Sequence, residues 1–367
     1  MEWIPLPIGV ENFEDLREHG YYFVDKTLFI KELLDMKGKV NLFTRPRRFG
    51  KTLNMSILRY FFEKGEKDNS GLFQGLKIMD AGEKYLSHMG KYPVISVSLK
   101  SMKQYSYDLA YDMLKKAVRE EYRRHWEQVK NSGKLGEAEV QRYERIRDLN
   151  GTESDYADSL KFLSECLYAC TGQRSVILID EYDVPLENAY FSRFYDRMVN
   201  LIRSLFESAL KTNDNLEFAV VTGCLRISKE SIFTGLNNLK IMSITSKTYA
   251  EHFGFTPEEV EQMLQDYGLE ENLETVKKWY DGYRFGEAEV YNPWSVINYV
   301  DSCYKNKNAF AKPYWSNTSS NSIVKNLIEH ADLSVRQEIE GLIEGGTITK
   351  PIHEDITYDD MNSTQDN

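Results

Sequence analysis

Three consecutive residues, Gly50, Lys51 and Thr52, have the types and the order needed to bind the phosphates of a nucleotide. They separate an apolar run, 40–43, from a stretch compatible with a helix, 53–62. The first N–H groups of a helix lack backbone partners and lie at the positive end of its dipole, so they stabilise an anion. At such a site Lys51 would reach the β- and γ-phosphates, and Thr52 would offer its hydroxyl to Mg²⁺. The triplet therefore predicts a phosphate-binding loop.

The loop departs from the usual pattern, which has a second glycine five residues before Gly50. Arg45 stands there instead, and Pro46 follows it. Because proline fixes φ and has no N–H donor, part of the backbone cradle must be built differently. The arginines Arg45, Arg47 and Arg48 can supply phosphate contacts in its place, or they can pair with acidic side chains at the surface. Of the three, we expect Arg48 to contact phosphate. The loop residues expected to bind the nucleotide are Arg48, Phe49, Gly50, Lys51, Thr52 and Leu53.

A second motif, at 176–181, is an apolar, β-branched run that ends in two carboxylates, as a buried parallel strand would. We expect Asp180 to hold Mg²⁺, usually through water, and Glu181 to orient or deprotonate the water that attacks the γ-phosphate. Taken singly, each motif has a plain structural alternative: a helix start with a solvated lysine, and a strand end that turns polar. Because both occur in the expected order and on the expected elements, we interpret the chain as a P-loop protein.

Composition limits the classes of protein to which the chain can belong. Its 367 residues, 41% of them hydrophobic, suit one nucleotide-binding core with a smaller appended domain. A net charge of −11 repels nucleic acid and anionic lipid, so a nucleic-acid partner would need a local basic patch. No apolar segment approaches the roughly 18 residues of a membrane span and no signal peptide is evident, so we expect a cytoplasmic protein without membrane association. The four cysteines lack CxxC spacing and are expected to be reduced thiols.

Apolar, β-branched runs alternate with helix-length stretches, which predicts an α/β fold: the three-layer sandwich of a P-loop NTPase with a parallel sheet. The candidate strands are 40–44, 93–99, 175–180, 217–222 and 240–244. We expect this core to span 1–246, with a helical insertion at about 101–171. Acidic residues interrupt the basic ones in the insertion, which favours solvated helices over a nucleic-acid patch.

Short helices with clear start signals follow the core. A capping box at Thr256 and a cap at Asn292 each begin a helix. We therefore expect a small helical, winged-helix-like domain at 247–335. The polar, acidic segment 336–367 is expected to be a partly disordered tail.

With these landmarks placed, the chain resembles the bacterial AAA-ATPase-like family, which is related to the archaeal-type and STAND ATPases. The resemblance covers about residues 4–340, and the segments RPRRFGKT and IDEYDVPL are its specific parts. The residues that carry it are 21–27, 45–52, 179–186, 222–223, 226–231, 237–239, 279–285 and 291–294.

This resemblance implies that the glycine-poor loop is typical of the family and that residues 23–26 pack near the adenine, although Phe23 and Val24 suit a core equally well. It also places Thr222 at the sensor position that monitors the γ-phosphate. Arg226 is implied either to stabilise charge during catalysis or to form a structural ion pair. The residues expected to act in catalysis are Glu181, Lys51 and Arg226.

The function that these observations favour is a Mg²⁺-dependent ATPase whose hydrolysis drives a conformational switch or motor module. The alternative is a nucleotide-binding regulatory module with negligible turnover that controls a protein partner or a nuclease domain. Family members commonly continue into a restriction-endonuclease-like nuclease domain, and we expect none to be encoded in these residues, unless the chain is a fragment. A nucleic-acid motor is less well supported, because the chain is acidic.

Overall fold

The computed structural model describes residues 3–65, 67–225, 232–233, 236–307, 309–315, 328 and 332–350. Arg226 and most of the predicted tail therefore lie outside the described residues.

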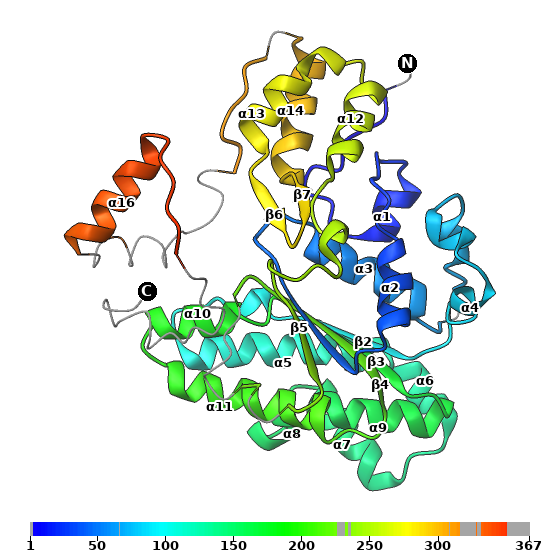
Figure 1. Cartoon of the computed structure of the whole chain (residues 1–367). Helices are drawn as coiled ribbons and strands as arrows, with labels where there is room; N and C mark the ends of the chain where they lie inside the picture. The colour runs from blue at the N-terminus through cyan, green and yellow to red at the C-terminus, as the bar shows by residue number, and fades with distance from the viewer. Residues whose placement is uncertain are drawn as a thin grey trace.

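A five-stranded parallel sheet forms the centre of the protein, with the strand order β2-β3-β4-β1-β5 (Figure 1). The parallel α/β fold predicted from the sequence is confirmed. Two strands have the predicted bounds, and the ends of the other three differ from the prediction by one or two residues. The strands are β1 (Val40–Thr44), β2 (Val94–Ser98), β3 (Ser175–Asp180), β4 (Leu216–Gly223) and β5 (Leu239–Met242).

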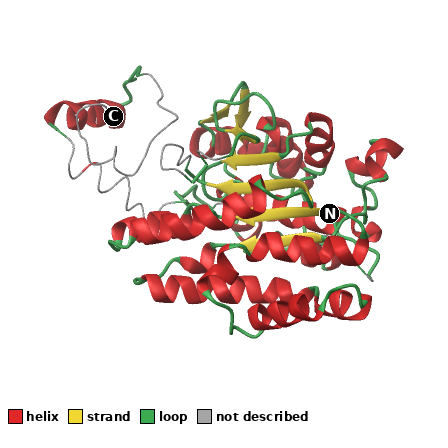
Figure 2. Ribbon diagram, turned by 90° about the horizontal axis from the view of Figure 1, so that it is seen from below, coloured by secondary structure: helices red, strands yellow, loops and turns green. Residues whose placement is uncertain are grey.

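Successive side chains of each strand face two different apolar cores, because side-chain direction alternates along a strand. In β1, Leu42 lies in one core and Phe43 in the other, and in β3 the same holds for Ile177 and Val176. Helices cover both faces of the sheet (Figures 1 and 2). On one face lie α5 (Tyr107–Arg124), α6 (Trp126–Ser132), α7 (Glu137–Arg147), α8 (Glu153–Ala157), α9 (Ser159–Thr171), α10 (Val184–Phe191) and α11 (Tyr195–Phe206). On the other face lie α1 (Phe13–Glu18), α2 (Leu28–Met36), α3 (Lys51–Phe62) and α4 (Glu83–Leu86).

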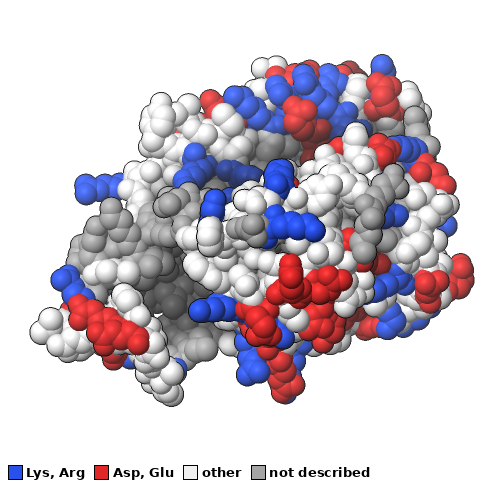
Figure 3. Space-filling model, turned by 90° about the horizontal axis from the view of Figure 1, so that it is seen from above, with Lys and Arg blue, Asp and Glu red and all other residues white. Residues whose placement is uncertain are grey.

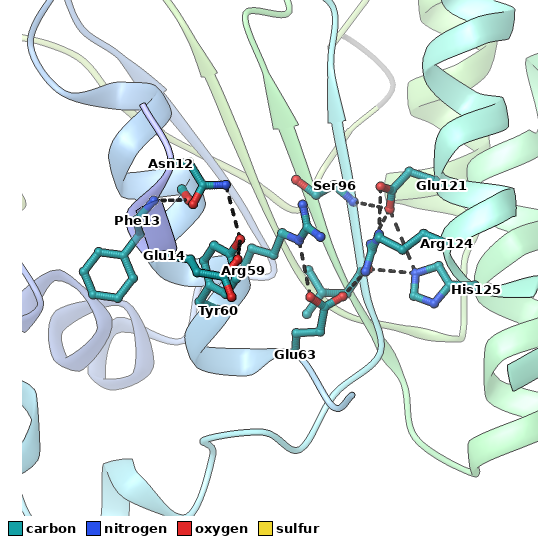
Figure 4. A network of polar contacts seen from close by, with 12 residues as sticks. Asn12, Phe13, Glu14, Arg59, Tyr60, Glu63, Ser96, Glu121, Arg124 and His125 are labelled. Carbon is teal, nitrogen blue, oxygen red and sulfur yellow. Dashed lines mark hydrogen bonds and ion pairs between the residues drawn. The ribbon is translucent and has the colours of Figure 1, made fainter. Parts of the chain in front are cut away.

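Polar side chains from α5 cover the free edge of β2 (Figure 4). Glu121 accepts the N–H of Ser96 at 2.8 Å, and His125 donates to the carbonyl oxygen of Val94 at 3.0 Å. Arg124 donates to the same carbonyl oxygen and pairs with Glu63 at the C-terminal end of α3. These bonds occupy backbone groups of an edge strand that would otherwise be free to pair with another strand.

Most of the helical residues after β5 form a second, smaller unit with its own apolar core. Other residues of this part of the chain, among them Phe253 and Phe285, pack instead in the core on the α3 face of the sheet. The predicted helix starts are present: Thr256 accepts the N–H of Glu259, and Asn292 accepts that of Ser295. A hairpin that the sequence analysis did not anticipate lies between two of the helices, because its strands are too short to show an alternating pattern. The elements are α12 (Pro257–Asp266), α13 (Leu273–Tyr280), β6 (Tyr283–Phe285), β7 (Ala288–Val290) and α14 (Pro293–Lys305).

The N-terminal segment, residues 3–12, extends from the second unit to the core. At its start, Trp3 stacks on Tyr304 with ring centroids 3.7 Å apart, and Leu6 belongs to the apolar core of the second unit. At its end, Asn12 caps α1 on the sheet. The segment therefore connects the second unit to the large core.

Helix α16 (Leu333–Ile343) crosses the boundary expected between the second domain and the tail, at 335–336. It has no buried side chain and lies apart from the rest of the protein in Figure 1. In the part of the chain that the structure describes, no helix combines the length and the apolar character that a membrane crossing requires.

Candidate nucleotide-binding site

The loop before α3 presents an open helix N-terminus. Gly50 is the N-cap residue, with a φ of +80°, and because it has no side chain the helix has no side-chain cap. Arg48 also has a positive φ, +70°, a conformation that costs a non-glycine residue roughly 1 kcal/mol or more and often marks a functional site. The amide groups of the first turn of α3 therefore remain suited to an anion, as the sequence predicts.

Lys51 lies beneath this loop. Its side chain is 6% exposed, and Nζ donates to the carbonyl oxygens of Arg45 at 3.0 Å and Pro46 at 2.9 Å. Nζ also lies 3.4 Å from Sγ of Cys224, in the segment that follows β4. The ammonium group is therefore held between the loop and the end of a neighbouring strand.

Two hydroxyl groups bind the two oxygens of one carboxylate at the end of the sheet. Thr52 donates to Oδ2 of Asp180 at 2.8 Å, and Thr222 donates to Oδ1. Strand β4 lies between β1 and β3 and so brings Thr222 between the loop and Asp180. Hydroxyl and carboxylate oxygens are the hard ligands that Mg²⁺ takes, so these residues fit the ion predicted from the sequence.

Glu181 follows directly, with a φ of +56°. Unlike Asp180 and Thr222, it lines the adjoining cavity. Burial raises the pKa of Glu181, and the neighbouring charge of Asp180 raises it further, whereas Lys100 and Lys51 lower it. A carboxylate with a raised pKa is a better proton acceptor than one in water, which suits a general base.

A cavity of about 670 Å³ opens above these groups, within the range of small-molecule sites. Its walls come from the loop, the ends of β2 and β3, α10, the N-terminal segment and the start of α14. The basic lining residues are Arg47, Arg48, Lys51, Lys100 and Lys103. The apolar lining residues include Pro7, Val10, Leu53, Phe191, Pro293, Trp294 and Ile297.

Arg45 corrects one interpretation of the loop. Its side chain is fully buried, and Nη1 donates to the carbonyl oxygens of Thr44 at 3.0 Å and Met242 at 2.9 Å. The guanidinium lies over the rings of Phe253 and Phe285, at 5.2 and 5.0 Å, and burial lowers its pKa to about 10. Arg45 therefore contacts neither the cavity nor a surface carboxylate, since it joins the ends of β1 and β5 to the second unit.

The other loop residues divide between the cavity and the second unit. Arg47 and Arg48 both line the cavity. The guanidinium of Arg48 lies 3.8 Å from the ring centroid of Trp294, and Arg47 pairs with Glu187 at 3.0 Å. Phe49, expected at the nucleotide, is fully buried, and its ring packs on the rings of β6 instead of lining the cavity. Residues 23–26, which the resemblance places near the adenine, do not line the cavity, and the N-terminal residues that do are Pro7, Gly9, Val10 and Glu11.

Sequence reasoning missed a pair of residues that fix the segment after β4. Asp183 is buried, and its Oδ2 accepts the N–H groups of Cys224 at 2.8 Å and Leu225 at 3.0 Å. Tyr182 donates its hydroxyl to the carbonyl oxygen of Leu225 at 2.5 Å and its N–H to that of Thr222 at 3.1 Å. The sequence signals were the position of both residues directly after Asp180 and Glu181 and their place in the segment IDEYDVPL, neither of which indicated this role. Lys100 and Lys103 were missed as well, because nothing in their local sequence marks them.

Comparison with known proteins shows the family of this chain. A family model described as "Predicted AAA-ATPase" matches residues 7–233, which include the loop and the ends of β3 and β4. The chain belongs to this AAA-ATPase-like family. It is also 29% identical over 325 residues to an "Uncharacterized protein in vnfD 5'region" of Azotobacter chroococcum mcd 1. That alignment covers 88% of this chain and 56% of the relative, so the chain spans little more than half the length of that protein.

Proposed function

We propose that this member of the AAA-ATPase-like family binds ATP with Mg²⁺ in the cavity and hydrolyses it. The observation that carries the proposal is the meeting of Thr52 and Thr222 on the two oxygens of Asp180, beside the buried Lys51 and an uncapped helix N-terminus. This is the arrangement of cation, amide donors and carboxylate that a bound triphosphate requires.

Each residue has a separate role in the proposed reaction. Lys51 and the first amides of α3 bind the β- and γ-phosphates. Thr52 and Asp180 would hold Mg²⁺, which supplies neutralisation of phosphate charge when it is bound. Glu181 orients the attacking water and accepts its proton. A charge-stabilising role for Arg226, which lies outside the described residues, stays a prediction.

The apolar wall of the cavity gives the base a place to bind. Trp294 and Ile297 come from α14 in the second unit, and Val10 comes from the N-terminal segment. A planar base packs well on such a surface. The choice of ATP over GTP follows from the family and not from a group that reads the base.

The second unit is joined to the loop closely enough to respond to the nucleotide. The N–H of Gly254 donates to the carbonyl oxygen of Phe49 at 3.3 Å, and Asn54 in the first turn of α3 donates to that of His252 at 2.9 Å. A change in the loop on binding or hydrolysis is therefore expected to move the second unit, which is the proposed switch. The winged-helix-like character of that unit stays part of the proposal.

The test is Mg²⁺-dependent ATP turnover by the purified protein, measured beside Glu181→Gln. The variant should bind ATP as the parent does, but its turnover should be at least about 10²-fold lower, because it lacks the proton acceptor. Equal turnover in both proteins would place the base elsewhere. Binding without turnover in either protein would favour the regulatory module, and absence of binding would overturn the proposal.

A further inference from the structure

Lys100 lies at the cavity on the side opposite the phosphate loop. It follows β2, the neighbour of β3, and the register pairs Ser98 with Asp180. The N–H of Leu99 still donates to the carbonyl oxygen of Asp180 at 3.0 Å. Lys100 therefore lies just beyond the last bond between the two strands, beside Glu181, where the attacking water is proposed to bind.

Three other cations at the cavity are held by contacts with backbone carbonyl groups, a carboxylate or an aromatic ring. Lys51 donates to two loop carbonyl groups, Arg47 pairs with Glu187 on α10, and Arg48 stacks on Trp294. Their positions are set by the loop and by packing, which places them on the side of the cavity where the phosphates and the base are proposed to bind.

Lys100 instead pairs with Glu11, with Nζ 3.3 and 3.4 Å from the two carboxylate oxygens. The two side chains are 60% and 58% exposed. A solvent-exposed ion pair of this kind contributes little and is screened by salt, so a phosphate group can displace the carboxylate at small cost. A doubly charged terminal phosphate is the stronger partner for the ammonium group.

We propose that Lys100 exchanges Glu11 for the γ-phosphate of bound ATP and stabilises the charge of that group during transfer to water. This inference rests on the proposed function. In the step, the water oxygen bonds to the γ-phosphorus while the bond from that phosphorus to the β,γ-bridging oxygen breaks. ADP leaves with the electron pair, and the water proton passes to Glu181. Lys100 forms no bond and supplies positive charge from within the same chain.

The exchange of Glu11 for the γ-phosphate also affects a contact that connects to the second unit. Glu11 is one of the residues of the N-terminal segment that line the cavity, and Leu6 of that segment lies in the second unit's core. ATP competes with Glu11 for Lys100, whereas ADP has no γ-phosphate to do so. The contact between the N-terminal segment and the end of β2 therefore differs between the ATP and the ADP complexes.

The experiment compares ATP and ADP affinities, with Mg²⁺, in the Glu181→Gln background so that ATP is not consumed. Adding Lys100→Ala should weaken ATP binding about tenfold and change ADP binding less than twofold, because only ATP carries the contacted group. Glu11→Gln should strengthen ATP binding and leave ADP binding unchanged, because the competing charge is gone. With Glu181 intact, Lys100→Ala should lower kcat by about 10²-fold or more, and Lys100→Arg should restore part of it.

Two controls separate this role from simple charge or folding effects. Lys84 is an exposed lysine paired with Asp35 at 2.6 Å and does not line the cavity, so Lys84→Ala should change neither affinity. Lys103 lines the cavity one turn further on, and loss of ATP selectivity in Lys103→Ala instead of Lys100→Ala would overturn the assignment. An unchanged ratio of ATP to ADP affinity in Lys100→Ala would also overturn it, whatever the parent's turnover. A parent protein that binds no ATP would overturn the proposed function itself.

Discussion

Gly223, the last residue of β4, lies against the side chains of Tyr182 and Asp183, and Gly223→Ala tests whether this close packing is needed. A Cβ at this position would lie 2.5 and 2.6 Å from two ring carbons of Tyr182 and 2.8 Å from Oδ1 of Asp183. Non-bonded carbon atoms prefer about 3.5–4.0 Å, so the methyl group would be roughly 1 Å too close to the two ring carbons.

The ring of Tyr182 cannot move aside without loss. It is fully buried, its centroid lies 5.2 Å from that of Phe233, and its hydroxyl is bonded to the segment after β4. Overpacking of a core site costs about 1–3 kcal/mol, and one strained hydrogen bond adds about 1 kcal/mol. We therefore expect Gly223→Ala to destabilise the protein by about 3 kcal/mol. Because Tyr182 follows Glu181, the same shift should lower turnover by about 10²-fold.

The assay is thermal and urea unfolding, run together with ATP turnover. At about 2 °C per kcal/mol for a large domain, the melting temperature should fall by about 6 °C. Gly71→Ala is the matched control, since a Cβ there would have no neighbour within 4 Å and its φ is not in the left-handed region. If Gly223→Ala unfolds like Gly71→Ala and keeps parental turnover, the close packing of β4 against Tyr182 and Asp183 does not constrain the site.

Two further predictions concern single side chains. Lys51→Ala should weaken ATP binding by about 10²-fold in a titration, because a buried cation that contacts phosphate is lost; an affinity equal to that of Lys84→Ala would contradict the phosphate-binding loop. His125→Gln should reduce the decrease in unfolding free energy that occurs at acid pH. Burial, together with the charge of Arg124, lowers the pKa of His125 to about 3, so the folded protein keeps the ring neutral. The corresponding stability is present above pH 6.5 and is lost as the pH falls toward 3, because the unfolded chain takes up the proton first. Between pH 6.5 and 4 the unfolding free energy, measured with urea, should therefore fall about 3 kcal/mol less in the variant than in the parent. Glutamine is chosen because its amide can still donate to Val94. Parallel curves of unfolding free energy against pH for the two proteins would contradict this account.

Properties that depend on neighbours along the chain were predicted well. The runs that became β1 and β3 are apolar on both faces, as buried parallel strands must be, and their ends carry the two motifs. The caps at Thr256 and Asn292 form because a side chain bonds to an amide three residues ahead. Such signals need no knowledge of the fold.

Predictions for the loop residues were less accurate, because their partners come from distant segments. Arg45 and Phe49 resemble phosphate-loop residues in the sequence, yet both are buried against the second unit. The residues next to Arg45 in the sequence give no sign that its side chain will contact the carbonyl oxygen of Met242 and the rings of Phe253 and Phe285, about 200 residues or more further along the chain. For the same reason the sequence did not indicate that Lys100 and Glu11 meet at the cavity.

The family, the parallel α/β core and the order of Lys51, Thr52, Asp180 and Glu181 could be predicted without the structure, since these depend on residue type and local period. Which groups meet at the site depends on the arrangement of the strands in space. The sheet order places β4 between β1 and β3, and this alone brings Thr222 onto Asp180 and Cys224 beside Lys51. Strand order is set by packing over the whole domain, because it depends on how all the helices cover the two faces, and no local pattern in the chain contains that information.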